Sequence, residues 1–185
     1  MASLTRFLAH HLRLRANTEK SAVARPWQRK FLGYSMTFDR KPRLKAANAS
    51  VQRFKEKIRE LIQQGRGRNI GKLIKELQPL IRGWTAYFKW VNVKSTFEEL
   101  DGWIRRKLRC ILWQQWKRSY TRAQRLMQQG IAEARAWQSA CNGRGSWWNA
   151  GASHMNEAFP KSFFDKLGLP SLLHEYQRLQ LTSSL

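Results

Sequence analysis

Carboxylates are scarce in this chain, which has 12 Asp and Glu residues against 35 Lys and Arg and a formal net charge of +23. Asp39, Asp101 and Asp165 are scattered, and Glu98, Glu99 and Asp101 suit the first turns of a predicted helix. No paired acidic motif therefore suits the Mg²⁺ ions that two-metal phosphoryl transfer needs. The chain also has no Walker-type phosphate loop and no Gly-x-Ser-x-Gly motif. We therefore predict no catalytic residues, no cofactor and no small-molecule substrate.

Cysteine and histidine are equally few. Cys110 and Cys141 stand far apart, and neither a Cys-x-x-Cys pair nor a Cys/His cluster with zinc-ligand spacing exists. We therefore predict no metal site. Cys110 falls in an apolar stripe and is predicted to be a buried thiol, as expected in the reducing cytoplasm.

Long apolar stretches are missing as well. No run of 18 apolar residues would span a membrane, and the basic, amphipathic first residues do not form a secretory signal. A membrane-surface protein is the alternative that the charge leaves open. We disfavour it because the charge is spread over several elements rather than gathered on one amphipathic anchor. We expect a cytoplasmic protein without a membrane partner.

What the chain does have is cations and aromatic residues. Its 185 residues include nine Trp and nine Phe, enough apolar area for a sizeable core. Residues 1–50 carry 11 basic and 2 acidic residues, residues 51–120 carry 17 and 6, and residues 121–185 carry 7 and 4. A compact domain with this charge needs a polyanion to neutralise it. We expect the anion-binding face in the first two thirds, with the last third serving for packing or capping.

The first part of the chain, residues 1–47, predicts a short helix and a hairpin. Apolar residues at helical spacing favour a helix over residues 3–14, which Ser3 would cap. The aromatic-rich alternation of residues 30–38 favours a strand, and residues 39–42 form a turn from which residues 43–46 return as the second strand.

Residues 48–119 predict three antiparallel helices that form a small bundle. The first has an apolar stripe that includes Phe54 and Ile58, and a Gly-Arg-Gly-Arg loop ends it. Asn69 would cap the second, in which Pro79 predicts a kink or a break. Ser95 and Glu98 predict a capping box that opens the third.

Residues 120–185 predict short helices only. Residues 121–129 and 131–141 read as two helices divided by Gly130, residues 142–146 as a loop, and residues 153–179 as helical fragments punctuated by Pro160, Gly168 and Pro170. The fold class is therefore mainly α: a three-helix bundle that follows a small β-hairpin and precedes short C-terminal helices.

The third bundle helix carries the strongest candidate for anion binding. At 3.6 residues per turn, Arg105, Arg106 and Arg109 share one flank, which would track a phosphate backbone. Trp113 and Trp116 lie one turn apart and would either stack on bases or fill the core. The competing interpretation is a solvated basic face with core tryptophans, and the net charge decides for anion binding.

Two further basic patches precede that helix. The Gly65–Arg68 loop places cations near the start of a helix, where free backbone N–H groups also attract phosphate. Such a sequence is also common in solvated turns, so both interpretations stay open. Alternation on the hairpin puts Arg43 and Lys45 on one face. The predicted anion-contacting residues are Arg43, Lys45, Arg53, Lys57, Arg66, Arg68, Lys72, Arg105, Arg106, Lys107, Arg109, Lys117 and Arg118.

An ordered set of motifs resembles one known family. The segments are FLGYSMTFDRKPRLKAANASVQRFKEKIREL, LQPLIRGWTAYFKW and LDGWIRRKLRCILWQQWKR. They are similar to the maturase-specific domain of group II intron reverse transcriptases, also called domain X, which is the thumb of that polymerase. Residues 12–21 are similar to the last palm segment before the thumb. Residues 145–148 and 164–172 look like the C-terminal end of the bacterial class C proteins, and the lack of a Cys/His endonuclease module fits that type.

The resemblance implies a role for each part. Residues 1–47 would be a residual palm segment with its hairpin, residues 48–119 the thumb, and residues 120–185 a C-terminal extension. Phe31, Leu32, Gly33 and Tyr34 would form the primer-grip-like hairpin that supports the primer end, and the basic helices would hold intron RNA. The Tyr-x-Asp-Asp polymerase motif and the fingers are missing and would lie before Met1, so we expect no reverse transcription by this chain alone.

Three hypotheses follow from this resemblance. The first is an RNA-binding module that supports splicing of a group II intron. The second is a C-terminal piece that complements a separately encoded fingers–palm polypeptide to form an RNA-directed DNA polymerase. The third is a non-functional gene remnant that folds poorly.

Overall fold

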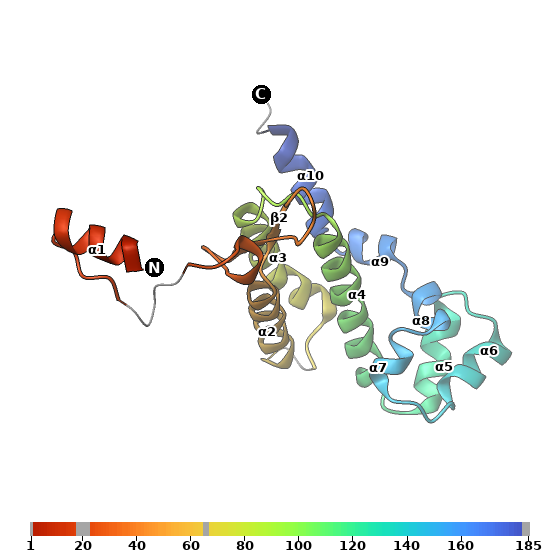
Figure 1. Cartoon of the computed structure of the whole chain (residues 1–185). Helices are drawn as coiled ribbons and strands as arrows, with labels where there is room; N and C mark the ends of the chain where they lie inside the picture. Colours follow the sequence, from red (N-terminus) through yellow and green to blue (C-terminus); the bar gives the residue numbers. More distant parts are fainter. Residues whose placement is uncertain (1, 18–22, 65–66, 183–185) are drawn as a thin grey trace.

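The computed structural model describes residues 2–17, 23–64 and 67–182, and helices dominate this part of the chain (Figure 1). Its strands form a two-stranded antiparallel sheet. In chain order the elements are α1 (Ala2–His11), the 3-10 turn η1 (Pro26–Gln28), β1 (Tyr34–Met36), β2 (Leu44–Ala46), α2 (Asn48–Gln64), α3 (Ile70–Tyr87), α4 (Ser95–Gln115), α5 (Ser119–Gln128), α6 (Glu133–Ala140), α7 (Ser146–Asn149), α8 (Ser153–Ala158), α9 (Lys161–Lys166) and α10 (Leu172–Thr182). The predicted fold class, mainly helical with a small hairpin near the N-terminus, is confirmed.

Helix α1 buries none of its residues, and Figure 1 shows it apart from the other helices. Leu4 and Phe7 are exposed, so no tertiary contact lengthens a helix that is short for independent stability. The helix therefore ends at His11 rather than at residue 14. It begins at Ala2, which places Ser3 inside the first turn and not at the predicted cap.

The hairpin pairs β1 with β2 in the register Tyr34 opposite Ala46 and Met36 opposite Leu44. The predicted strand over residues 30–38 is shorter than expected because its first part folds into a tight turn. Phe31 and Tyr34 exchange two backbone hydrogen bonds of 2.9 Å, and the residues between them, Leu32 and Gly33, have φ angles of 48° and 80°. Two positive φ angles define the hairpin turn that glycine favours.

The turn is anchored to the helices beneath it. The Ser50 hydroxyl donates to the carbonyl of Gly33 at 3.0 Å, and the Tyr87 hydroxyl donates to the carbonyl of Leu32 at 2.7 Å. A Cβ at Gly33 would lie 3.0 Å from Ser50 Oγ and 3.4 Å from Phe88 Cζ. Position 33 therefore requires glycine both for its backbone angle and for space.

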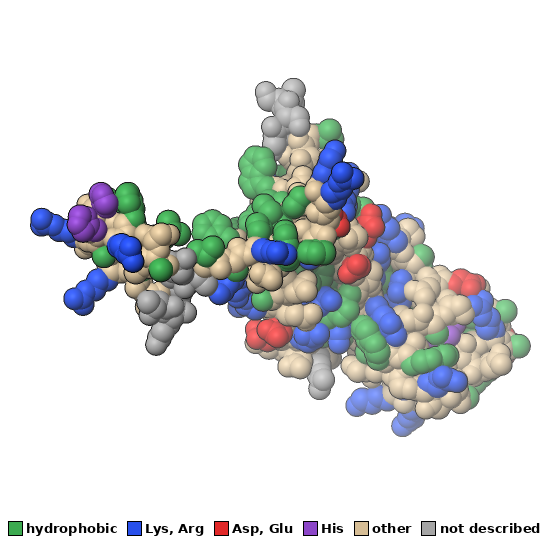
Figure 2. Space-filling view, in the orientation of Figure 1, with side chains coloured by type: hydrophobic (Ala, Val, Ile, Leu, Met, Phe, Trp, Pro, Cys, Tyr) green, Lys and Arg blue, Asp and Glu red, His purple; other side chains and the backbone are tan. Residues whose placement is uncertain are grey.

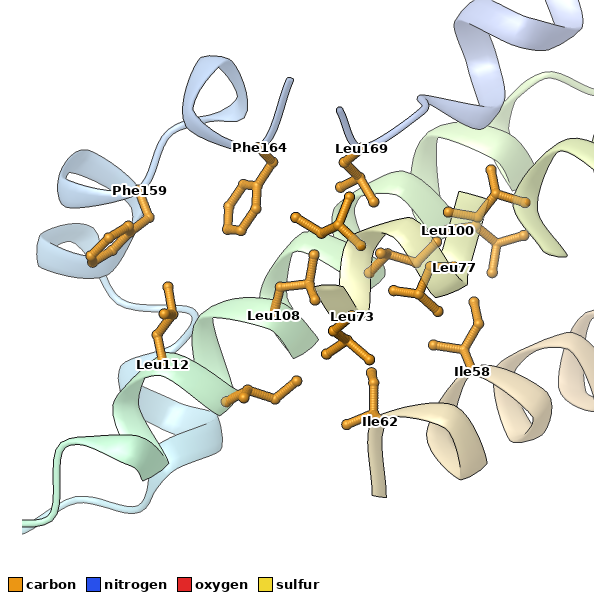
Figure 3. Close-up of a cluster of buried hydrophobic side chains, with 14 of the residues drawn as sticks. Ile58, Ile62, Leu73, Leu77, Leu100, Leu108, Leu112, Phe159, Phe164 and Leu169 are labelled. Carbon is orange, nitrogen blue, oxygen red and sulfur yellow. The ribbon is translucent and has the colours of Figure 1, made fainter. Parts of the chain in front are cut away.

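Helices α2, α3 and α4 pack around the predicted apolar stripes. Phe54, Ile58 and Ile62 of α2 are buried against α3 and α4, and Figure 3 shows Ile58 and Ile62 beside Leu73 and Leu77. The α3 cap also follows the prediction, because the Asn69 side chain accepts a 2.7 Å hydrogen bond from the Gly71 amide. Burial of one such aliphatic side chain contributes about 1.5–3 kcal/mol.

Two local predictions for this bundle differ from the structure. Of the kink or break predicted at Pro79, the break does not occur, because α3 runs unbroken from Ile70 to Tyr87 with the proline on its exposed side; the kink stays a prediction. Solvent can hydrate the carbonyl that the missing N–H leaves free. The capping box is wrong: Lys94 precedes α4 already in helical conformation, so Ser95 lies inside the helix and makes no capping hydrogen bond.

The C-terminal segment packs on the opposite side of α4. Leu112 of α4 faces Phe159, and Phe164 lies close to Leu108 (Figure 3). One cluster of buried side chains extends from Ala46 to Tyr176. The division of the chain at residues 47 and 119 stays a prediction, and this core extends across both boundaries.

The short C-terminal helices occupy the predicted places. Gly130 (φ 87°) divides α5 from α6, Pro160 precedes α9 and Gly168 (φ 84°) follows it. The loop predicted at residues 142–146 continues into the one-turn helix α7. Cys110 is buried, as predicted for a structural thiol.

Candidate nucleic-acid interface

Cations cover much of the molecule rather than one face. Figure 2 shows Lys and Arg side chains in many separate places on the visible surface and Asp and Glu side chains in a few, with a hydrophobic area in the upper middle of the view. In the described part of the chain, the ion pairs are Arg43–Asp39, Arg68–Glu76, Arg135–Glu157 and Arg178–Glu175. Charge alone therefore does not locate a binding site. Hollows and aromatic contacts are needed to distinguish one surface from another.

The predicted basic flank of α4 is only partly available. Arg109 is buried, and its Nε donates a 2.9 Å hydrogen bond to the carbonyl of Phe159. Burial, together with the charge of Arg105, lowers the pKa of Arg109 to about 10. The prediction that Arg109 contacts a polyanion is wrong, because the C-terminal segment covers that position.

The tryptophans of the same helix belong to the core. Trp113 and Trp116 are 1% and 7% exposed, so neither indole presents a face on which a base would stack. Of the two roles predicted for them, core filling is the correct one. Arg105, Arg106 and Lys107 stay partly exposed on α4.

A hollow of about 420 Å³ lies between the tight turn, α2 and α3. Arg53 and Lys57, one helical turn apart, line it together with Leu32 and Gly33. The structure thus brings two predicted cation positions to the predicted primer-grip-like turn. Trp84 and Tyr87 supply aromatic walls, so this hollow combines positive charge with flat apolar surface.

A second hollow, of about 120 Å³, lies between α2 and α4, and the polar residues that line it are Arg59, Gln63, Lys107 and Gln114. Beside it, the indole of Trp103 has Lys55 Nζ, Arg59 Cζ and Lys107 Nζ at 5.6, 5.4 and 5.7 Å from its ring centroid. Each distance is within the range of a cation–π contact.

The exposed side of α2 separates these two hollows. Arg53 and Lys57 lie on one flank of the helix, Lys55 and Arg59 on the other, and Glu56 and Glu60 project between them at 100° per residue. None of the four cations is in one of the four ion pairs above. A polyanion that binds α2 is therefore attracted to the cations at the two hollows and repelled by Glu56 and Glu60 between them.

The third basic region surrounds the end of α4. A hollow of about 600 Å³ is lined there by Gly67, Gln114, Gln115 and Lys117. The Gln115 side chain donates a 3.0 Å hydrogen bond to the Arg68 carbonyl, so the loop before α3 is tied to this place. Arg68 is paired with Glu76, Lys72 and Arg118 are exposed, and Arg66 lies outside the described residues.

The hairpin cations are less available than predicted. Arg43 Nη2 lies 3.1 Å from Asp39 Oδ2. A hydrogen bond from Thr37, followed by that with Arg43, lowers the pKa of the Asp39 carboxyl. Lys45 is half-buried opposite Ser35. These two cations are not among the side chains that line the hollows described above.

Sequence reasoning missed Trp103, Lys55 and Arg59 as members of a site. Lys55 and Arg59 were visible as cations on the polar side of a predicted helix, but nothing local pairs them with a tryptophan more than 40 residues away. Among residues 2–17, 23–64 and 67–182, no cluster of three His, Cys, Asp or Glu side chains is arranged to hold a metal ion. Within the same residues, no helix has both the length and the hydropathy that crossing a membrane requires.

The fold and these surfaces define a class: small, basic, mainly helical modules in which cationic hollows flank exposed aromatic rings. Residues 51–130, from the first turn of α2 to Gly130 just after α5, match the family model described as "Group II intron, maturase-specific domain". This stretch of the chain is therefore similar to a group II intron maturase-specific domain, in agreement with the resemblance seen in the sequence. A search of curated proteins found no match.

Proposed function

We propose that this chain binds group II intron RNA and supports splicing of that intron, acting as a binding module and not as a polymerase by itself. The matched domain supports the coarse assignment. The observation that carries the binding surface is the pair of cationic hollows on the two flanks of α2, where Arg53, Lys57, Arg59 and Lys107 lie without carboxylate partners among the described residues.

Phosphate neutralisation is the physical reason for this assignment. A folded RNA carries a dense negative charge, and each Lys or Arg that contacts a phosphate releases a condensed counterion. Side chains already held over rings or along hollow walls lose less conformational freedom on binding than free surface lysines. The hollows of α2 are thus favoured over the scattered cations elsewhere.

The test is RNA binding by a charge-matched pair of double variants. Arg53→Gln with Lys57→Gln should weaken binding of a group II intron RNA by roughly tenfold for each lost phosphate contact at 0.1 M salt. Lys161→Gln with Lys166→Gln removes the same charge from exposed positions on α9 and should change affinity little. Equal losses in a filter-binding assay would show that only net charge matters and would refute the hollows as the site.

A second candidate function is supported by the tight turn. Phe31 and Leu32 are 79% and 68% exposed, although the turn that presents them is anchored by Ser50 and Tyr87. A fixed apolar tip on the surface fits contact with a further protein part, such as a fingers–palm polypeptide. Mixing this chain with such a polypeptide and measuring primer extension on an RNA template tests it, and a lack of DNA synthesis would end the idea.

The class C type, and the interpretation of residues 1–47 as a palm segment, belong to the same proposal. Residues 18–21 of the palm-like stretch lie outside the described residues. The hairpin of β1 and β2 and the segment around α7, which carry the other parts of the resemblance, lie outside the matched range 51–130.

A further inference from the structure

A row of tryptophans and cations crosses from the matched domain to the C-terminal segment. Lys107 of α4 lies between two indoles, with its Nζ 5.7 Å from the ring centroid of Trp103 and 4.7 Å from that of Trp147. Trp103 is one turn before Lys107 on α4, whereas Trp147 belongs to α7, 40 residues later. The lysine therefore links two aromatic rings that come from distant parts of the chain.

Arg106 holds the second ring in place. Its guanidinium carbon lies 4.2 Å from the centroid of Trp147, and its Nε and Nη2 donate to the Trp147 carbonyl at 3.3 and 3.0 Å. Within the described part of the chain, its Nη1 makes no hydrogen bond, so that nitrogen is available to an acceptor from outside. A Cβ at Gly151 would come within 2.7–2.8 Å of the same guanidinium, so the guanidinium lies directly against Gly151.

A further hydrogen bond joins the short helix α7 to α4, and others hold the loop that leads into α7. Gln114 Nε2 donates to Ser146 Oγ at 3.1 Å, and the buried Asn149 side chain donates to the carbonyls of Arg144 and Gly145 at 2.9 and 3.2 Å. Arg144 in turn lies over Trp148, 4.4 Å from its centroid. Trp148 and Arg144 therefore belong to the same hydrogen-bonded segment as Trp147.

Core packing does not account for the indoles of Trp147 and Trp148, whereas Trp103 is partly buried against the core. Trp147 and Trp148 are 39% and 46% exposed, whereas Trp113 on the same α4 surface is 1% exposed. The cations around them are not in any of the four ion pairs of the described chain. Exposed rings held in a fixed position beside uncompensated cations form the arrangement that binds the bases and phosphates of an unpaired nucleic-acid strand.

We propose that this surface binds unpaired nucleotides of the intron RNA, an inference that rests on the proposed function. We name the surface the tryptophan ladder and define it by Lys55, Arg59, Trp103, Arg106, Lys107, Arg144, Trp147 and Trp148. Bases stack on the exposed parts of the indoles, while the phosphates contact the cationic side chains. A duplex is disfavoured because its bases already stack on one another and present only edges to the grooves. The C-terminal segment beyond residue 130 is then part of the RNA-binding face and not packing alone.

The test compares two RNA probes on the full chain by fluorescence anisotropy at 0.1 M salt. One is an unstructured 12-nucleotide strand, and the other is a blunt RNA duplex with the same number of phosphates per strand. Trp103→Ala with Trp147→Ala should weaken binding of the unpaired strand by about 5- to 150-fold for each stacked base that is lost. Binding of the duplex should change less than threefold.

Three further variants complete the test. Trp90 is 60% exposed and has Lys89 Nζ 4.6 Å from its centroid, so it is a cation–tryptophan pair outside the ladder, and Trp90→Ala should leave the affinity for the unpaired strand unchanged. Gly151→Ala keeps every charge and every indole but displaces the guanidinium of Arg106, and it should weaken the same affinity. Trp147→Phe keeps an aromatic face and should restore most of the binding lost in Trp147→Ala, while a thermal melt checks that each variant is folded.

The outcomes separate the two proposals. If the wild-type chain binds neither probe at 0.1 M salt, RNA binding itself fails. If it binds both and the double variant behaves like Trp90→Ala, RNA binding stands and the tryptophan ladder is refuted. Equal weakening of strand and duplex would also refute it, because the surface would then recognise phosphates without unpaired bases.

Discussion

Several single residues of this chain have roles that their positions in the sequence did not predict. Arg109 belongs to a run of cations, yet it donates to Phe159 inside the protein. Arg109→Ala should lower the free energy of unfolding by about 1–3 kcal/mol, because it leaves a buried carbonyl unpaired.

Urea unfolding measures this change, and RNA affinity of the folded variant should equal that of the wild type. Arg105→Ala, on the partly exposed side of the same helix, is the matched comparison. A variant of Arg109 that unfolds normally but loses RNA binding would contradict the buried role.

His154 makes stability depend on pH. Its side chain is buried beside Trp113, and its Nε2 has no hydrogen-bond partner within the described residues. Burial, and secondarily the charge of Arg135, lower the pKa of His154 below its ordinary value of 6.5. Between the folded and unfolded pKa values, the unfolded chain binds a proton that the folded chain does not.

The free energy of unfolding should therefore fall as pH drops below about 6.5, and this contribution should be complete above that pH. His154→Phe removes the titration and should flatten the decline between pH 7.5 and pH 5 in urea unfolding experiments. An equal decline in wild type and variant would assign the pH dependence to other groups.

Leu32 adopts a backbone conformation that suits asparagine or glycine better. Its φ of 48° costs a branched or bulky residue roughly 1–2 kcal/mol, and its exposed side chain recovers little of that by burial. Leu32→Asn should raise the free energy of unfolding by about 1 kcal/mol, since Asn-Gly is the preferred pair for this turn. Thermal denaturation checks it, and a lower melting temperature would show that Leu32 makes a stabilising contact.

At the scale of elements, the last helix is held by a residue of α4. Asp101 is buried, and its Oδ1 accepts from the Leu172 amide at 2.8 Å while its Oδ2 accepts from the Ser171 hydroxyl at 2.6 Å. A carboxylate at a helix N-terminus satisfies free N–H groups and opposes the positive end of the helix dipole. This cap fixes α10 on the bundle, where Tyr176 stacks on Phe97.

Asp101→Ala should cost about 2–3 kcal/mol and release α10 before the rest of the molecule unfolds. Hydrogen exchange of the amides in 172–182 is the appropriate measurement. Asp101→Asn keeps a hydrogen-bond acceptor and should lose an intermediate amount of protection in α10. Unchanged protection of α10 in the alanine variant would mean that its apolar contacts suffice.

The whole molecule is dominated by its net charge of +23. Neutralising about six phosphates predicts a slope of roughly −4 to −5 in a plot of log affinity for RNA against log salt concentration. The measurement is filter binding between 50 and 400 mM salt. A slope near zero would exclude the hollows and the tryptophan ladder alike, because both depend on phosphate contacts.

Local sequence patterns predicted the elements well where one side of a helix faces the core. The stripes of α2 and α3, the Asn69 cap, the hairpin and the break at Gly130 follow from periodicity and turn chemistry, which act over a few residues. The patterns failed where the chain has alternatives of similar energy. Phe31–Tyr34 has strand-like composition but folds into a turn that Gly33 permits, and the capping box at Ser95 did not form because the chain enters α4 already helical.

The residue types of the candidate site could be predicted from the sequence, but the contacts among them could not. Arg53 and Lys57 on one flank of α2 follow from helical spacing alone. Their closeness to the tight turn depends on packing between α2, α3 and the hairpin, and the pairing of Lys107 with Trp147 joins residues 40 apart. Helical periodicity shows which residues share one side of a helix, but it does not show which residues of distant segments come into contact.

By itself, the sequence determined that this protein is helical, strongly basic and without a carboxylate pair suited to two-metal chemistry. Composition and local periodicity suffice for these properties, because they depend on neighbours within a few residues. Only the tertiary structure decided which cations reach solvent. The segment from α7 to α9 covers one flank of α4, burying Arg109 and placing tryptophans beside Arg106 and Lys107, and this choice depends on packing between segments far apart in the chain.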